Sequence, residues 1–511
     1  MKLKKLIRLE KYTFTKYSAV LIAIFLFALS LRLYLAFQTS HFSNDAYFNL
    51  REIENIKETG VPFLYDDLSF GGRAINFLPM FHYIIAFFSL FMPTWIAAKI
   101  IPNVMASSLV FIMYYIAKHM IKRRDGALFA AFISAFIPIF FYKTLNNVSE
   151  LSLVIPLLFL AFYFFLRLKE DKKYSTYYVI TLFFLVLAHQ TIIILILGLL
   201  LYWLFIKLEN LPTNKAELEI ILFSVFLVIW INFIAFKRAL LFHGHYVVWQ
   251  NIPLEILDNY FTNINVLEAV YQIGVIPFAL GIYIIYKTLF KEKKIQIFIL
   301  IAFSMAVAFL LWLKLIRPEI GLIYLGAVLT LLFSYYYVSF SNLIDKSNIH
   351  RYKSFLIFLL IALFALTSIY PSVHYGLEEI GRAPSKNEIA ALDWLESNSV
   401  PQDVILSAPE DGNLISYYAT RKNVIDNNYL LVNDARQRYI DVTDIFTTLY
   451  SVDANQLLNK YEVKYIYISR SAEREFGVSD LKYAEKNCFS LVYSSDDVKV
   501  YKPLCKITET I

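Results

Sequence analysis

Residues 17–52 read YSAVLIAIFLFALSLRLYLAFQTSHFSNDAYFNLRE, an apolar run followed at once by a polar loop. The run from Tyr17 to Phe37 is long enough to cross a hydrocarbon core of about 30 Å. It lacks a small-residue cleavage pattern, so we expect a signal anchor rather than a cleaved signal peptide. The stretch predicts an anchored chain whose first polar loop, carrying Asp45, begins directly at a membrane surface.

The rest of the chain repeats this apolar pattern. Hydrophobic residues make up 58% of the 511 residues and the mean hydropathy is +0.55, more than a soluble domain of this size needs for its core. We therefore expect a polytopic α-helical membrane protein. Apolar runs of spanning length lie near 17–37, 95–117, 125–143, 150–168, 174–189, 190–207, 216–236, 270–290, 295–313, 319–339 and 354–372.

The distribution of basic residues predicts the orientation. The run from Phe77 to Met92 is short and contains Pro79, and if it lies in the membrane interface, the basic loops all fall on the same side as the amino terminus. The positive-inside rule makes that side the cytoplasm. We expect about eleven transmembrane helices, a cytoplasmic amino terminus, and an extracytoplasmic loop 38–94. The net charge of +7 largely reflects this bias, so it predicts no nucleic-acid partner.

The hydropathy falls after Pro371. Helical spacing at 387–398 and 454–461, strand-like runs at 404–407 and 464–469, and a closing hairpin at 489–493 and 498–501 are typical of an α/β domain. We expect two domains: a transmembrane domain over 1–372, with a catalytic first external loop at 38–94, and a soluble extracytoplasmic α/β domain over 373–511. Its cysteines, Cys488 and Cys505, could form a disulfide or remain two buried thiols.

The first loop resembles a known signature. Phe42 to Arg51 is similar to the first external loop of the oligosaccharyltransferase catalytic subunit, with the acid at Asp45 followed by Tyr47, Phe48, Asn49 and Arg51. Further segments at 63–67, 70–73, 130–150, 391–396, 403–407, 415–421 and 424–428 are similar to that subunit in order and spacing. The resemblance implies the GT-C fold of membrane glycosyltransferases that use polyprenyl-phosphate sugars. It also implies that Asp45 is the first-loop acid and Glu150 a second acid.

Two departures from that subunit change the expected acceptor. The Asp-x-Glu motif keeps only its glutamate in Val148, Ser149 and Glu150, and Ala408-Pro-Glu-Asp-Gly412 replaces the sequon-reading Trp-Trp-Asp-Tyr-Gly element. An amide nitrogen is a poor nucleophile that needs several carboxylates and a metal, whereas a sugar hydroxyl needs one well-placed base. The sequence therefore favours transfer of a sugar to a hydroxyl-bearing glycan or lipid. An oligosaccharyltransferase-like enzyme with a protein acceptor, and a non-enzymatic binder or transporter of lipid-linked glycans, remain alternatives.

Two acids are the candidate catalytic residues. Asp45 could be a general base or acceptor-positioning carboxylate, or only the N-cap of the helix that follows. Glu150 could be a second acid, or a first-turn residue favoured by the dipole of the next helix.

The donor phosphate needs cations. Arg317, Lys314 and Arg73 are the external candidates, although Arg317 could instead be an interfacial residue. Asp66, Asp67, Glu268 and His189 are possible further site residues. A divalent cation, Mg²⁺ or Mn²⁺, would have Asp45 and Glu150 as its only strong protein ligands and would bind weakly.

Overall fold

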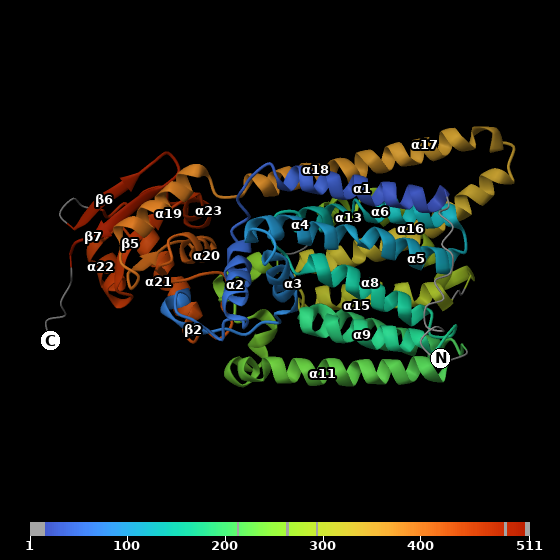
Figure 1. Ribbon diagram of the computed structural model, residues 1–511, viewed down its shortest axis with the longest axis horizontal. Coiled ribbons are helices and arrows are strands. Elements are labelled where there is room, and N and C mark those ends of the chain that lie inside the picture. Colours follow the sequence, from blue (N-terminus) through green and yellow to red (C-terminus); the bar gives the residue numbers. More distant parts are fainter. Residues whose placement is uncertain (1–15, 212–213, 262–264, 293–294, 485–487, 506–511) are drawn as a thin grey trace.

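A computed structural model describes residues 16–211, 214–261, 265–292, 295–484 and 488–505. Long helices run along the longest axis of the molecule and an α/β domain closes one end of them (Figure 1). The first polar loop lies at the junction, where α2 (Ala46–Thr59) stands beside α3 (Met80–Ser89). The polar loop that follows the first apolar run is thus placed between the two parts of the fold.

Helices occupy all eleven ranges in which the sequence predicts a span. They are α1 (Lys16–Ala36), α4 (Thr94–Ser107), α5 (Leu109–Ile121), α6 (Arg124–Ser134), α7 (Pro138–Lys143), α8 (Leu151–Leu166), α9 (Lys173–Ala188), α10 (Ile193–Leu208), α11 (Lys215–His243), α14 (Val275–Lys287), α15 (Ile295–Trp312), α16 (Pro318–Asp345), α17 (Lys353–Phe364) and α18 (Tyr370–Gly381).

By length and composition, six described helices can cross a membrane, or seven if the bent pair Val266–Ile273 and Val275–Phe290 is one span. The chain has the helical fold of a membrane protein, and the count of eleven stays a prediction. Proline explains part of the difference, because Pro138 starts a new helix and divides the predicted span 125–143. The ten residues of α3 extend about 15 Å, half the hydrocarbon thickness, as expected for an interfacial helix.

The α/β domain is built on a five-stranded mixed sheet. The strand order is β4 (Lys422–Asn423), β3 (Val404–Leu406), β5 (Val463–Ile468), β7 (Lys499–Pro503) and β6 (Phe489–Ser494). The first three strands are parallel, and β7 runs antiparallel to both of its neighbours. The expected strands and the closing hairpin are present, as are the expected helices α19 (Lys386–Asn398) and α22 (Ser451–Lys460).

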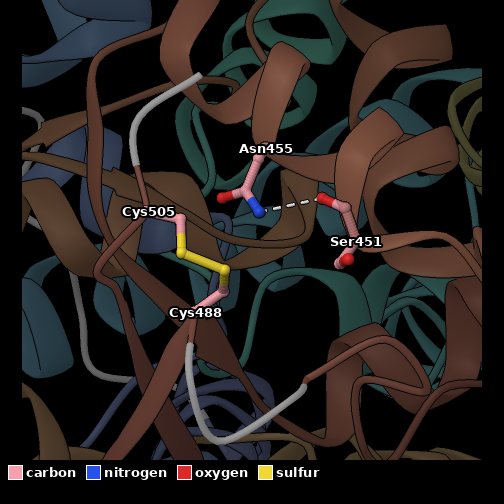
Figure 2. The surroundings of a disulfide bond; sticks show 4 residues. All are labelled: Ser451, Asn455, Cys488 and Cys505. Carbon is pink, nitrogen blue, oxygen red and sulfur yellow. Dashed lines mark hydrogen bonds between the residues drawn. A yellow bond between two sulfur atoms is a disulfide. The ribbon is translucent and has the colours of Figure 1, made fainter. Parts of the chain in front are cut away.

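A disulfide joins Cys488 to Cys505 across the end of this sheet, with 4.8 Å between the Cα atoms (Figure 2). Asn455 of α22 lies beside it and donates a hydrogen bond to the carbonyl of Ser451 at 2.8 Å. The structure thus selects the disulfide from the two alternatives that the sequence left open. A disulfide is expected in an oxidising compartment, in agreement with the predicted extracytoplasmic position.

The α/β domain packs onto the loops that connect the helices through a shared apolar core. Phe70 of the first loop and Ile252, Ile256 and Phe261 near α12 (Leu254–Tyr260) are buried together with Tyr429 and other residues of the domain. Polar contacts reinforce this core, since Asn423 donates its backbone N–H to the Leu68 carbonyl at 2.8 Å. The loops and the domain therefore form one continuous packed unit around the site described next.

Candidate functional site

A cavity of about 910 Å³ lies where the helices, the external loops and the α/β domain meet. Five of the site residues expected from the sequence line it, namely Asp45, Arg73, Glu150, His189 and Arg317. Apolar side chains of the membrane helices line one part of the wall, among them Ile193, Phe236 and Leu310. Polar side chains of the α/β domain line another part, so the cavity is amphipathic.

Asp45 occupies the N-cap position of α2 but does not cap the helix with its side chain. The residue is exposed, and its Oδ1 instead accepts a hydrogen bond from Asn427 Nδ2 of the α/β domain at 3.3 Å. The capping alternative therefore does not account for this carboxylate. Its side chain faces the cavity, where it is free to contact a ligand.

A short network connects Asp45 to Arg317. Tyr260 donates its hydroxyl to Asn427 Oδ1 at 3.3 Å, while Asn427 donates to Asp45. The Arg317 guanidinium lies over the Tyr260 ring, 5.0 Å from its centre. Arg317 also donates to Gln250 Oε1 at 3.2 Å, and no carboxylate in the described residues forms an ion pair with it. Its charge thus remains available to an anionic ligand in the cavity.

The backbone around Arg317 favours an anion as well. Arg317 is the N-cap residue of α16, and Pro318 occupies the first helical position, where a missing N–H costs nothing. The N–H groups in the first turn of a helix and the helix dipole together attract negative charge. The Arg317 guanidinium and the N-terminus of α16 therefore both favour binding of an anion.

Asn49 of the first-loop signature holds the loop in place. Asn49 donates to the Val148 carbonyl at 3.0 Å and pairs with His82 Nε2 at 2.9 Å. Val148 has φ 48°, a strained conformation for a β-branched residue, in the turn that leads to Glu150. The signature asparagine thus ties the first external loop to the second, which carries the other candidate acid.

His82 lies beside Glu150, and His189 lines the cavity. His82 is fully buried, and burial lowers its pKa to about 3, so the ring is neutral although Glu150 Oε1 lies 3.8 Å away. His189 Nδ1 accepts the backbone N–H of Thr191 at 3.1 Å, which leaves Nε2 as the protonated nitrogen of the neutral ring. The cavity wall therefore contains a histidine N–H donor near Glu150 and Arg317.

Arg73 has a mixed role. It donates to Ser69 Oγ of the same loop at 2.6 Å and to the Leu430 carbonyl at 3.0 Å, and the second bond holds the loop against the α/β domain. Its third nitrogen, Nη2, has no hydrogen-bond partner and is 3.7 Å from Asp426. Arg73 therefore positions the wall and presents one further donor.

The α/β domain contributes two acids that sequence reasoning missed. Glu410 lies in the first turn of α20 (Pro409–Tyr418), and Glu475 lies on α23 (Arg470–Phe476). Desolvation, with a contribution from Asp45, raises the pKa of Glu410, although the charge of Arg474 opposes it. Desolvation, with a smaller contribution from Glu410, raises the pKa of Glu475 to about 7. The charge of Asp45 in the first loop thus affects the ionisation of Glu410 in the α/β domain.

Four expected site residues lie away from the cavity lining. Asp66 is buried and accepts two bonds from Arg51, at 2.7 and 2.8 Å. Burial alone would raise the pKa of Asp66, but these bonds and the charge of Arg51 lower it. The pair of Asp66 and Arg51 therefore stabilises the loop. The neighbouring Asp67 is exposed.

The other two are engaged at the surface. Lys314 is exposed and pairs with Asp258 at 3.2 Å, so its ammonium is already partly neutralised. Glu268 is exposed on α13 (Val266–Ile273) and accepts a bond from Gln272 at 2.9 Å. Of the three expected phosphate ligands, Arg317 and Arg73 line the cavity and Lys314 does not, and their role in binding phosphate stays a prediction.

A metal centre is not preformed. Within the described ranges, no group of three His, Cys, Asp or Glu side chains is arranged to hold an ion. Asp45 and Glu150 both line the cavity, so a divalent cation there would need further oxygen ligands from a phosphate and from water. The weak cation site that the sequence predicts at Asp45 and Glu150 stays a prediction.

Comparison with known proteins supports the fold. Residues 78–233 match the family described as dolichyl-phosphate-mannose-protein mannosyltransferase. A segment of 116 residues is 28% identical to dolichyl-phosphooligosaccharide-protein glycotransferase 2 of Archaeoglobus fulgidus. That match covers 22% of this chain and 19% of the relative, so the chain spans only a small part of the relative's length.

Solved structures extend the likeness over most of the chain. The Archaeoglobus fulgidus oligosaccharyltransferase tethered to an acceptor peptide is similar with a TM-score of 0.65 and 17% identity, over 90% of this chain and 70% of that one. The same protein has been solved in complex with Zn and sulfate. ArnT from Cupriavidus metallidurans bound to undecaprenyl phosphate is similar with a TM-score of 0.54 and 10% identity, over 95% and 97% of the two chains.

Both solved structures share their fold with most of this chain despite low sequence identity. They confirm the predicted resemblance at the level of the fold, whereas the roles of the signature residues stay predictions. The chain thus has the fold of the GT-C membrane glycosyltransferases.

Proposed function

We propose that this protein transfers a sugar from a polyprenyl-phosphate-linked donor to a hydroxyl-bearing glycan or lipid on the extracytoplasmic face of the membrane. The proposal rests on one cavity, lined by Asp45, Glu150 and Arg317, that lies between apolar helices and the polar α/β domain. A lipid-linked substrate needs apolar and polar walls side by side. Both are present here.

The donor phosphate is assigned to Arg317. Its guanidinium can bind phosphate oxygens with two parallel bonds, and the first turn of α16 adds its N–H groups. Arg73 Nη2 and the Nε2–H of His189 supply further donors on the same wall. The apolar side chains from α10, α11 and α15 would contact the beginning of the polyprenyl chain. The undecaprenyl phosphate bound to ArnT is a ligand of the class proposed here.

The acceptor is assigned to the side of Asp45. As the acceptor oxygen bonds to the anomeric carbon, its proton passes to the Asp45 carboxylate, and the bond between that carbon and the phosphate oxygen breaks. The electron pair leaves on the polyprenyl phosphate, whose negative charge Arg317 stabilises. Asn427 holds Asp45 through Oδ1, so Oδ2 is left to receive the proton.

A divalent cation fits this site only with help from the donor. Asp45 and Glu150 would hold it, and phosphate oxygens and water would complete its shell. When bound, it would supply positive charge for the departing phosphate. The Archaeoglobus structure with Zn and sulfate shows that a relative of this fold accommodates both kinds of ion.

The experiment offers purified protein a pool of polyprenyl-phosphate sugars with either methyl glycosides or an Asn-Val-Thr peptide. We expect transfer to the glycosides, and we expect only a modest loss on addition of EDTA. Efficient, EDTA-sensitive modification of the peptide would instead favour the oligosaccharyltransferase-like alternative, for which the tethered peptide of the Archaeoglobus enzyme is the precedent.

The non-enzymatic alternative has a different signature. A binder or transporter would bind the lipid-linked sugar without releasing polyprenyl phosphate. Release of that product by the wild-type protein, and its loss in Asp45→Asn, would exclude this alternative.

A further inference from the structure

The α/β domain carries a group of polar side chains on the cavity wall that the steps above do not use. They are Glu410 and Asn413 on α20, Asn428 and Tyr429 in the loop after β4, and Glu475 on α23. Two of them are buried and carry an atom without a partner: Asn413 Oδ1, on a residue 3% exposed, and the Tyr429 hydroxyl, on a residue 1% exposed. Burying an unsatisfied polar group is unfavourable, so these atoms point to a ligand that completes them.

The packing of the α/β domain fixes the positions of these wall residues. Gly412 has no room for a side chain, because a Cβ there would lie 2.2 Å from the Ile425 carbonyl oxygen. This close approach places the first turn of α20 against the loop after β4. Asn423 strengthens the contact by donating to the Gly412 carbonyl at 3.0 Å. Glu410 and Asn413 are thereby brought to the same wall as Asn428 and Tyr429.

A third element completes the wall. Arg474 on α23 donates to Glu410 Oε2 at 2.9 Å and to Ser471 Oγ at 3.2 Å, which ties α23 to α20. Glu475, the next residue, lines the cavity. Arg474 also neutralises part of the charge of Glu410, so the wall is less anionic than its two carboxylates suggest.

We infer that Glu475, Asn413 and Tyr429, with Glu410 beside them, form a subsite that binds the hydroxyl groups of a glycan acceptor. This inference rests on the proposed function and adds the acceptor class and the residues that select it. Carboxylate and amide oxygens accept hydrogen bonds, whereas the tyrosine hydroxyl and the asparagine amides also donate. Neighbouring sugar hydroxyls both donate and accept, so they match this mixture. An ammonium group only donates and would leave the donors of the wall unpaired.

The position of the subsite agrees with this role. The same loop that carries Asn428 and Tyr429 also carries Asn427, which bonds to Asp45. A glycan held on Tyr429 and Asn413 would therefore have a hydroxyl within reach of the candidate base. Arg317 lies on the other side of Tyr260, where the donor phosphate is assigned. The subsite thus places the two substrates on opposite sides of the Asp45 network.

The test measures binding without turnover. Saturation-transfer NMR on the full-length protein in nanodiscs would use methyl β-glucoside, methyl α-mannoside and methyl β-galactoside, with ethanolamine as a cationic probe. Tyr429→Phe removes only the unpartnered hydroxyl, and we expect about 3–10-fold weaker binding of the best glycoside. For Glu475→Gln, which replaces one carboxylate oxygen by an amide that can only donate, we expect about tenfold or more.

Matched controls separate binding from folding. Tyr467→Phe removes another buried hydroxyl without a partner in the same domain, but Tyr467 does not line the cavity. Glu473→Gln removes an exposed carboxylate on α23 that lies outside the lining as well. Both controls should bind like the wild type. If Tyr429→Phe fails to fold, Asn413→Leu provides a second test, since it also removes an unsatisfied atom.

Each outcome is decisive. Weaker glycoside binding in the wall variants alone supports the subsite, even if no sugar transfer is found, in which case only the proposed function fails. Equal binding by wall variants and controls, preference for ethanolamine, or no glycoside binding at all would overturn the subsite. If hydroxyl acceptors are nevertheless glycosylated, the proposed function stands without it.

Discussion

Asn427 Nδ2 donates a hydrogen bond to Asp45 Oδ1 at 3.3 Å, although 382 positions separate the two residues in the chain. The bond crosses from the α/β domain to the first external loop. It explains why the side chain of Asp45 points into the cavity instead of capping α2. The candidate base of the membrane domain is therefore oriented by the soluble domain.

Asp45→Asn should abolish sugar transfer, by at least about 100-fold, because the amide cannot accept the acceptor proton. The melting temperature should change little, since the side chain makes no capping bond in the wild type. Turnover of donor and thermal unfolding would be measured on the same preparation. Glu58→Gln, which alters an exposed carboxylate at the end of α2, is the matched control. Wild-type turnover in Asp45→Asn would remove Asp45 from the chemistry.

Asn427 should act as a positioning residue. Asn427→Ala removes the donor to Asp45, and we expect kcat to fall about tenfold while KM for the donor lipid changes little. Asn427→Asp should be worse than the alanine variant, because it places a second carboxylate against the first. Equal kcat values for the two variants would contradict an electrostatic role and indicate a structural one.

Arg317→Ala should raise KM for the lipid-linked donor by about tenfold or more, because a charge-assisted phosphate contact is lost. Arg317→Lys should recover only part of this loss, since an ammonium cannot reproduce the two parallel bonds of a guanidinium. Lys314→Ala should have a smaller effect, because Lys314 lies outside the cavity lining and pairs with Asp258. A larger effect at Lys314 than at Arg317 would refute the phosphate assignment.

Asp411 predicts a pH dependence of stability. Burial raises its pKa to about 8 in the folded protein, although a hydrogen bond from Ser469 partly opposes this, whereas an unfolded aspartate titrates near 3.9. The folded state therefore holds a proton that the unfolded state releases between these values. The associated stability is complete below about pH 4 and is lost as the pH rises to about 8.

Asp411→Asn removes this titration. We expect the variant to unfold at a higher temperature than the wild type at pH 8, with a difference that shrinks toward pH 4. Thermal unfolding of the full-length chain, followed by intrinsic fluorescence across this range, measures it. Asp453→Asn, at an exposed site on α22, should leave the pH profile unchanged. A parallel shift of both variants would argue against Asp411 as the source.

The predicted topology places the α/β domain outside the cell. Replacing both native cysteines by serine and introducing Gln402→Cys at an exposed position gives a single reporter on that domain. A membrane-impermeant thiol reagent should label it in intact cells. Asn348→Cys, in the loop between α16 and α17, should be labelled only after permeabilisation. The opposite pattern would invert the orientation and remove the first loop from the extracytoplasmic face.

The sequence alone was sufficient for the features that depend on local pattern. Apolar runs gave the positions of the helices, because a chain in lipid must satisfy its backbone internally. The first-loop signature located Asp45, and strand-like runs indicated the sheet of the last domain. Asn49 and Arg51 belong to that signature. Their contacts with Val148 and Asp66 depend on tertiary packing and could not be predicted from it.

Only the tertiary structure decided which polar residues share the cavity. In the sequence, Asp66 and Lys314 cannot be told apart from Asp45 and Arg317 as candidate site residues. In the structure, Asp66 forms an ion pair with Arg51, and Lys314 lies at the surface beside Asp258. Glu410, Glu475 and Tyr260 carry no local pattern that links them to the first loop. Glu410 and Tyr260 come close to Asp45, and Glu475 lines the same cavity, because the shared core of Phe70, Ile252 and Tyr429 packs the α/β domain against the loops between the helices. Side chains so distant in the chain become neighbours through packing, and no local periodicity encodes which surfaces pack together.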